Sequence, residues 1–134
     1  MSLLSGKKVL IGVTGGIAAY KSAMLVREFI KAGCEVKVIM TPAAKDFVTP
    51  LTLSTLSKNE VFSSFYNEDN ENAQWNNHVE LGLWADLFII APATANILCK
   101  AAMGVADEIV STTLSICDVP ILFAPAMNFR MWQN

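Results

Sequence analysis

The chain has 134 residues, 53% of them hydrophobic, and 12 acidic against 10 basic residues give a formal net charge of -2. This length fits one domain with one core, and the lack of long basic blocks excludes the usual footprint of a nucleic-acid-binding protein. Because the N-terminus lacks the order of a signal peptide and no apolar run is long enough to cross a bilayer, we expect a cytoplasmic protein without a membrane partner.

Strand and helix patterns alternate from the start of the chain. The β-branched run "KKVLIGV" (7–13) predicts a strand that ends in a tight turn over 14–16. Apolar residues at helical spacing then predict a helix over 17–33, and "EVKVIMT" (35–41) predicts a second strand. A helical crossover of this kind joins parallel strands, so residues 7–41 are expected to form one right-handed βαβ unit.

The middle of the chain is less regular. A threonine cap before Pro50 predicts a short helix through Leu56, and a brief strand is expected over 60–62. Residues 66–77 are polar, lack periodicity and are rich in Asn and Asp. This composition predicts a loop that leads to His78, the only histidine of the chain.

Two apolar strand patterns with two helices between them follow. "ADLFIIAP" (85–92) and "VPILFAP" (119–125) are continuous apolar runs, typical of strands buried on both faces of a parallel sheet. Between them, helical patterns over 94–104 and 106–117 are separated at Gly104. Strands that alternate with helices predict an α/β fold, namely a Rossmann-like doubly wound parallel sheet with helices on both faces.

The three cysteines, Cys34, Cys99 and Cys117, lie among apolar neighbours without the Cys-x-x-Cys spacing of a redox or zinc motif. We expect buried thiols in a reducing compartment. With one histidine and no cluster of ligand residues at suitable spacing, the sequence predicts no metal site.

Ligands of doubly wound sheets bind beyond the carboxyl ends of the strands, where turns expose backbone N–H groups. Four such turns are expected to share one pocket, at residues 14–17, 41–43, 91–96 and 124–128.

The first of these turns carries glycines at 12, 15 and 16, which give G-x-x-G-G in place of the dinucleotide fingerprint G-x-G-x-x-G. The second strand ends in Thr41, where a nicotinamide dinucleotide site would need an acidic residue for the ribose. The pattern therefore disfavours a dinucleotide and suits a single phosphate, with the Thr41 hydroxyl as an added donor. The alternative is a tight strand-to-helix turn that binds no ligand.

Polar residues elsewhere have structural explanations as well. Thr94 and Asn96 follow a buried strand, where capping the next helix explains them as well as ligand binding does. A lone histidine such as His78 is more often a hydrogen-bonded structural residue than a catalyst, although imidazole exchanges protons near neutral pH. Met131 and Trp132 are of types that more often pack in a core or a subunit interface. A serine hydrolase is not supported, because G-x-S-x-G is absent from the sequence.

Three segments in chain order resemble the flavin-dependent cysteine decarboxylases: "GVTGGIAAYK" (12–21), His78-Val-Glu-Leu ahead of "WADLFIIAPATAN" (84–96), and "APAMNFRMW" (124–132). The resemblance covers residues 6–134. Residues 92–96 are similar to the family's Pro-Ala-Ser-Ala-Asn-Thr flavin motif, with Thr94 in place of serine and Ile97 in place of the last threonine. Residues 125–132 match its Pro-x-Met-Asn-x-x-Met-Trp substrate motif at every fixed position.

The resemblance implies that the cofactor is FMN, with its phosphate on the glycine turn. The residues that it implies for FMN binding are Gly15, Gly16, Ile17, Thr41, Thr94, Ala95, Asn96 and Ala126. It also implies that His78 is the catalytic acid/base. Asn128 and Met131 would bind the substrate, with Asn128 hydrogen-bonded to its carboxylate and amide.

The reaction implied by the resemblance is decarboxylation of 4'-phosphopantothenoylcysteine to 4'-phosphopantetheine in coenzyme A biosynthesis. A saturated cysteine has no sink for the electron pair that carbon dioxide leaves behind. Hydride transfer from the carbon that bears sulfur to FMN would give a thioaldehyde, decarboxylation would yield an ene-thiolate, and return of the hydride would complete the product. The alternatives are a peptidyl-cysteine decarboxylase that acts on a lantibiotic precursor and a non-catalytic FMN-binding regulatory subunit. The histidine and the substrate motif argue against a flavin prenyltransferase.

Members of the family assemble as homotrimers, trimers of trimers or dodecamers with FMN near a subunit boundary, and the resemblance implies such an assembly here. Their final reduction relies on a cysteine in a flap that follows the substrate motif, and none of the three cysteines of this chain matches that position. We therefore expect residues 1–134 to be a flavoprotein domain that is truncated before the substrate flap and C-terminally incomplete.

Overall fold

The computed structural model describes residues 3–64 and 78–134, and these residues form four β-strands and eight helices. In chain order the elements are β1 (Lys8–Val13), η1 (Ile17–Lys21), α1 (Ser22–Lys31), β2 (Glu35–Met40), η2 (Pro42–Asp46), α2 (Pro50–Ser57), α3 (His78–Trp84), β3 (Leu87–Ala93), α4 (Ala95–Met103), α5 (Ile109–Ile116), β4 (Ile121–Pro125) and α6 (Phe129–Gln133). The loop predicted over 66–77 lies outside the described residues. Within the described ranges, no helix is long and apolar enough to cross a bilayer.

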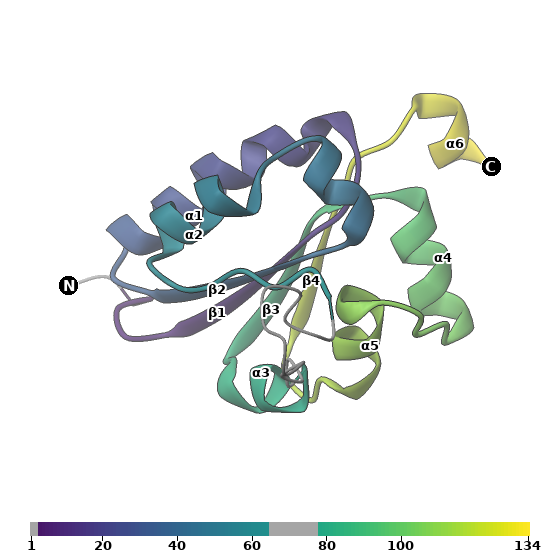
Figure 1. The fold of residues 1–134 in the computed structure, drawn as a ribbon. Helices are drawn as coiled ribbons and strands as arrows, with labels where there is room; N and C mark the ends of the chain where they lie inside the picture. The colour runs from purple at the N-terminus through teal and green to yellow at the C-terminus, as the bar shows by residue number, and fades with distance from the viewer. Residues whose placement is uncertain (1–2, 65–77) are drawn as a thin grey trace, which may run out of the picture.

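The four strands form one parallel sheet in the order β2-β1-β3-β4 (Figure 1). β1 pairs with β2 over its whole length, up to Val13 opposite Met40. Its pairing with β3 is shorter and ends at Gly12 opposite Ile90. The chain steps outward from β1 to β2 and then returns to the other side of β1 for β3, so the winding reverses between β1 and β3. This order confirms the doubly wound sheet and places a topological switch point at the ends of β1 and β3.

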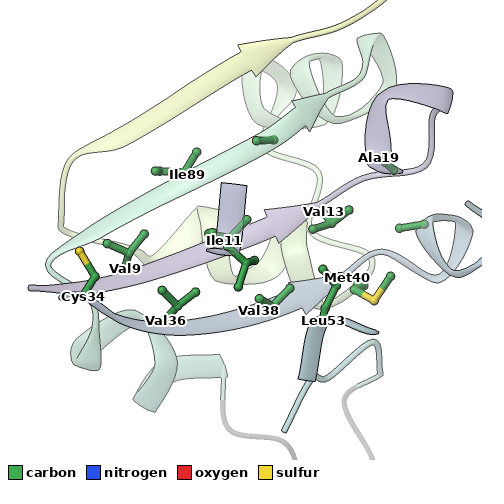
Figure 2. Close-up of a cluster of buried hydrophobic side chains, with 13 residues drawn as sticks. Val9, Ile11, Val13, Ala19, Cys34, Val36, Val38, Met40, Leu53 and Ile89 are labelled. Carbon is green, nitrogen blue, oxygen red and sulfur yellow. The ribbon is translucent and has the colours of Figure 1, made fainter. Parts of the chain in front are cut away.

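Helices cover both faces of the sheet, and successive side chains of each strand point to opposite faces. α1 and α2 cover one face (Figure 1), where Ile11 and Val13 of β1 belong to the buried cluster drawn in Figure 2. α3, α4 and α5 cover the other face, around Ile90 of β3. A Cβ at Gly12 would lie on this second face, 3.0 Å from Ile90 Cδ1 and 3.1 Å from Val110 Cγ1. The absent side chain therefore lets α5 approach β1 closely.

Two predicted elements differ in detail from the structure. The helix predicted over 17–33 begins as the 3-10 helix η1, becomes α-helical only in α1, and is followed by Gly33 with φ 88°. Such 3-10 turns are frequent at the N-termini of α-helices. The strand predicted over 60–62 is reduced to a single parallel bridge between Phe62 and Ile39.

The three cysteines occupy different environments. Cys34 is buried as predicted, and burial raises the pKa of its thiol. Cys117 is half-buried, whereas Cys99 is exposed, so the prediction of buried thiols is wrong for Cys99. Cys99 lies two residues after the buried Ile97 in α4, and this spacing places it on the opposite, outer side of the helix.

β4 is the least covered strand of the sheet. Leu122 is 54% exposed and Phe123 is 38% exposed, whereas Phe88 and Ile90 of the neighbouring β3 are fully buried. Burial of this strand on both faces, as predicted from its apolar run, is therefore wrong for the described residues. The physical reason is that β4 lies at the edge of the described sheet and pairs there only with β3.

Candidate functional site

The turn after β1 packs closely on the loop after β2. A Cβ at Gly15 would lie 2.7 Å from the Ala43 Cβ and 3.0 Å from the Ala43 carbonyl carbon, so glycine alone fits without a backbone shift. Gly16 is the N-cap of η1 with φ -166°, an extended conformation that any residue adopts. A Cβ at Gly16 would lie 3.5 Å from Thr94 Cγ2, an ordinary contact distance. Gly15 is thus the sterically required glycine of this turn.

The turn after β3 leads directly into α4. Thr94 is the N-cap of α4, and its hydroxyl accepts a hydrogen bond from the Ile97 N–H at 3.3 Å. The capping role that the sequence left as an alternative is therefore real. Asn96, the other polar residue predicted in this turn, is exposed. The Ala91–Pro92 peptide bond that precedes this turn is cis.

The turn after β4 joins the same edge of the sheet. The Ala126 N–H donates to the Ala93 carbonyl at 3.0 Å, which continues the β3–β4 pairing into the turn. Asn128 is the N-cap of α6, and its side-chain oxygen accepts a hydrogen bond from the Arg130 N–H at 2.8 Å. α6 buries none of its residues against the described part of the chain.

These three turns surround a cavity of about 630 Å³ at the switch point of the sheet, a volume typical of small-molecule sites. The residues that line it are Gly15, Gly16, Ile17, Ala18, Tyr20, Lys21, Pro92, Thr94, Ala95, Asn96, Ala126, Met127, Asn128 and Met131. Nine of the eleven predicted site residues are among them, and the exceptions are Thr41 and His78. The pocket expected from four turns is thus built by three of them.

Thr41 lies beside the turn after β1 and does not line the cavity. Its N–H donates to the Val13 carbonyl at 3.0 Å, and the residue is 9% exposed. Its hydroxyl oxygen is buried and has no hydrogen-bond partner within the described ranges. Because buried hydroxyls nearly always have a partner, this one marks a polar position that a bound group near the turn would satisfy.

His78 is the first residue of α3 and is half-buried. α3 packs against α5, and its Leu81 contributes to the cluster on that face of the sheet. Figure 1 shows α3 far from α6, on the other side of the molecule in that view. His78 does not line the cavity of its own chain, so the structure does not bring it together with Asn128 within one copy.

Lys21 is a residue of the site that the sequence analysis did not single out. Of the described residues that line the cavity, it is the only charged one. Lys21 lies four residues after Ile17, a predicted site residue, and this spacing places the two on one face of a helix that starts at Ile17. In a 3-10 helix, residues three apart eclipse one another, and Lys21 lies three residues after Ala18, which also lines the cavity. The signal that could have identified Lys21 is therefore its spacing from Ile17 and Ala18.

The sheet order and the cavity at the switch point define this chain as an open α/β domain that binds a small ligand at the carboxyl ends of its strands. Residues 2–134 match the Flavoprotein family. The chain belongs to this family, which confirms the resemblance drawn from the three sequence motifs.

Named relatives agree with this assignment. A probable phosphopantothenoylcysteine decarboxylase of Streptococcus mutans is 51% identical over 130 residues, 96% of this chain and 72% of that protein. The coenzyme A biosynthesis bifunctional protein CoaBC of Vibrio vulnificus is 43% identical over 134 residues, 100% of this chain and 33% of that protein. The chain thus spans about a third of the length of that relative. The solved structure of the FMN-dependent cysteine decarboxylase SpaF matches with a TM-score of 0.86 at 32% identity, over 98% of this chain and 74% of that one.

Proposed function

We propose that this domain binds FMN in the cavity, and that its full chain decarboxylates 4'-phosphopantothenoylcysteine in the cytoplasm as a step of coenzyme A biosynthesis. The observation that carries the proposal is the cavity at the switch point, where residues of the glycine turn, the flavin motif and the substrate motif meet. The two relatives named above, one a probable phosphopantothenoylcysteine decarboxylase and one an FMN-dependent cysteine decarboxylase, support the same cofactor and reaction.

The residues around the cavity fit a ligand with one phosphate. Residues 15–17 present backbone N–H groups at the start of η1, where an anion is favoured. Lys21 is the only cation among the described lining residues, and the buried Thr41 hydroxyl lies near the same turn without a partner in the described chain. The remaining wall, which would hold the rest of the cofactor, consists of Thr94, Ala95, Asn96 and Ala126.

Bound FMN supplies a reversible hydride acceptor, which the saturated cysteine of the substrate needs before it can lose carbon dioxide. The substrate motif would bind and orient that cysteine. The Asn128 side-chain oxygen already accepts the α6 capping bond, which leaves its NH₂ group to donate to the substrate carboxylate. Met131 also lines the cavity and would offer an apolar contact to the substrate.

The proposal assigns proton transfer to His78 across a subunit boundary. His78 does not line the cavity of its own chain, and α3 lies far from α6 (Figure 1). The proposal is that in a homotrimer, or in a trimer of trimers or dodecamer built from it, α3 of one copy would reach the cavity of the next. Ile17, Tyr20 and Met131 are exposed apolar residues that line the same cavity, and they support such a contact because a contiguous exposed apolar patch marks an interaction site.

FMN binding is tested by the absorption spectrum of the purified full chain. We expect a yellow protein whose flavin bands remain after gel filtration. A colourless protein that cannot be reconstituted with added FMN would contradict the cofactor proposal.

Turnover is tested by release of carbon dioxide from 4'-phosphopantothenoylcysteine. We expect His78→Asn and Asn128→Ala to retain FMN and to release almost no carbon dioxide. Because the two residues of one site would come from different copies, an assembly mixed from both variants should regain roughly a quarter of the parental rate by random assortment. Mixed assemblies that stay inactive would contradict the assignment across a boundary, and full turnover by His78→Asn would remove its acid/base role.

A peptide that ends in cysteine is the competing substrate, and the same assay separates it from the proposed one. The proposal predicts faster release from 4'-phosphopantothenoylcysteine than from the peptide. The opposite preference would favour peptidyl-cysteine decarboxylation. No release from either substrate by an FMN-loaded full chain would favour a regulatory FMN-binding protein.

A further inference from the structure

The turns after β1 and β3 lie on either side of the switch point, and the backbone pairing between their strands stops early. The last paired residues are Gly12 and Ile90, although β1 continues to Val13 and β3 continues to Ala93. The ends of the two strands carry the turns of the cavity. These ends are therefore outside the backbone pairing that joins the rest of β1 and β3.

The other neighbouring turns at this edge are joined by backbone bonds. On one side, the Thr41 N–H donates to the Val13 carbonyl at 3.0 Å. On the other side, the Ala126 N–H donates to the Ala93 carbonyl at 3.0 Å. The junction between β1 and β3 is different, because the bonds recorded there involve a side chain.

That side chain is Thr14, which is 1% exposed. Its hydroxyl donates to the Pro92 carbonyl and accepts a hydrogen bond from the Thr94 N–H at 3.3 Å. A hydroxyl can make both bonds because it is a donor and an acceptor at once. Pro92 has no N–H, so its backbone cannot donate a hydrogen bond to β1. The Thr14 hydroxyl instead donates a hydrogen bond to the Pro92 carbonyl.

We propose that Thr14 is a positioning residue, whose hydroxyl fixes the separation of the glycine turn from the turn over 92–96 and thereby the width of the FMN site. Thr14 does not line the cavity, so it acts through its neighbours Gly15 and Thr94. Gly15 is already held against Ala43 on its other side, so the Thr14 bonds leave the two turns little freedom to separate. This inference rests on the proposed binding of FMN in the cavity.

The test compares Thr14→Val, which replaces the hydroxyl by a methyl group of similar shape, with Thr14→Ser, which keeps the hydroxyl. The measurements on the full chain are FMN affinity by fluorescence titration, the flavin absorption spectrum, and the melting temperature without FMN. We expect Thr14→Val to bind FMN about tenfold to 100-fold more weakly with a shifted spectrum, and Thr14→Ser to stay within about threefold of the parent. A Thr14→Val variant that melts lower but binds FMN with parental affinity and spectrum would overturn the positioning role.

Hydrogen exchange without FMN separates this inference from the cofactor proposal. The Thr94 amide should be protected in the parent and in Thr14→Ser, and should exchange at least about tenfold faster in Thr14→Val. If the parent shows this protection but binds no FMN, the cofactor proposal fails while the link between the turns stands. An unprotected Thr94 amide in the parent overturns the inference, even if Thr14→Val does not fold.

Discussion

The cavity has two walls that are built in different ways. We call residues 15–17 and 92–96 the inner wall and residues 126–131 the outer wall. The inner wall follows the central strands β1 and β3 and is held by the buried Thr14 hydroxyl. The outer wall follows the least covered strand and ends in α6, which buries none of its residues. The fold therefore prepares the inner half of the site within one chain and leaves the outer half open, as a site for substrate and a second copy would require.

The largest effect is expected from a substitution that disturbs the close packing of the inner wall. Gly15→Ala places a Cβ 2.7 Å from the Ala43 Cβ and 3.0 Å from the Ala43 backbone, so one of the two turns must shift. Overpacking of this kind costs about 1 to 3 kcal/mol. We expect FMN affinity to fall at least about tenfold, measured by fluorescence titration.

The matched control is Gly82→Ala in α3, where an added Cβ would meet nothing within 4 Å in the described structure. Alanine there favours the helix by roughly 0.5 to 1 kcal/mol, so we expect an unchanged FMN affinity and an equal or higher melting temperature. Equal loss of affinity in both variants would show that the effect of Gly15→Ala is not local to the inner wall.

The second prediction concerns the cap of the inner wall. Thr94→Ala removes the hydroxyl that accepts the Ile97 N–H bond at the start of α4. Because α4 packs on the core through the buried Ile97, loss of the cap should cost about 1 kcal/mol and lower the melting temperature by roughly 3 to 6 °C. An unchanged melting temperature in thermal unfolding would contradict the view that the inner wall is part of the cooperative fold.

Most of the inner wall could be predicted from the sequence, because its signals are local. A glycine turn between a strand and a helix, and Thr94 after an apolar run, follow from residues adjacent in the chain. The Thr14 link could not be predicted this way. Its partner Pro92 is 78 residues away, and the bond depends on where the pairing of two strands stops.

The outer wall and His78 show where local patterns stop being informative. The apolar run over 119–125 has the pattern of a buried strand, but burial depends on what packs beside the strand, and in the described chain β4 has only β3. His78 and Thr94 belong to the same segment of the family resemblance. The strand β3 runs along the sheet between them, so α3 and the cavity lie apart.

A smaller effect is expected from Lys21, which is the only charged residue among the described residues that line the cavity. Lys21→Gln should weaken FMN binding about threefold to fivefold at low salt, because an exposed cation beside a phosphate is partly screened by water. The difference from the parent should shrink as salt is raised. Riboflavin, which has no phosphate, should bind both proteins equally, and the exposed Lys45→Gln serves as the control for a general loss of positive charge. Equal weakening of riboflavin binding would show that Lys21 shapes the wall and does not act on the phosphate.

The smallest change in stability is expected from the outer wall. Asn128→Ala removes the cap of α6 just as Thr94→Ala removes the cap of α4, so the two variants are a matched pair. α6 has five residues and buries none of them, and a helix this short adds little stability, so the cost should stay below about 0.5 kcal/mol. FMN affinity should remain within about twofold of the parent, whereas carbon dioxide release should be lost because the amide no longer holds the substrate carboxylate. If Asn128→Ala lowers the melting temperature as much as Thr94→Ala does, α6 belongs to the cooperative core and the two walls are not different in kind.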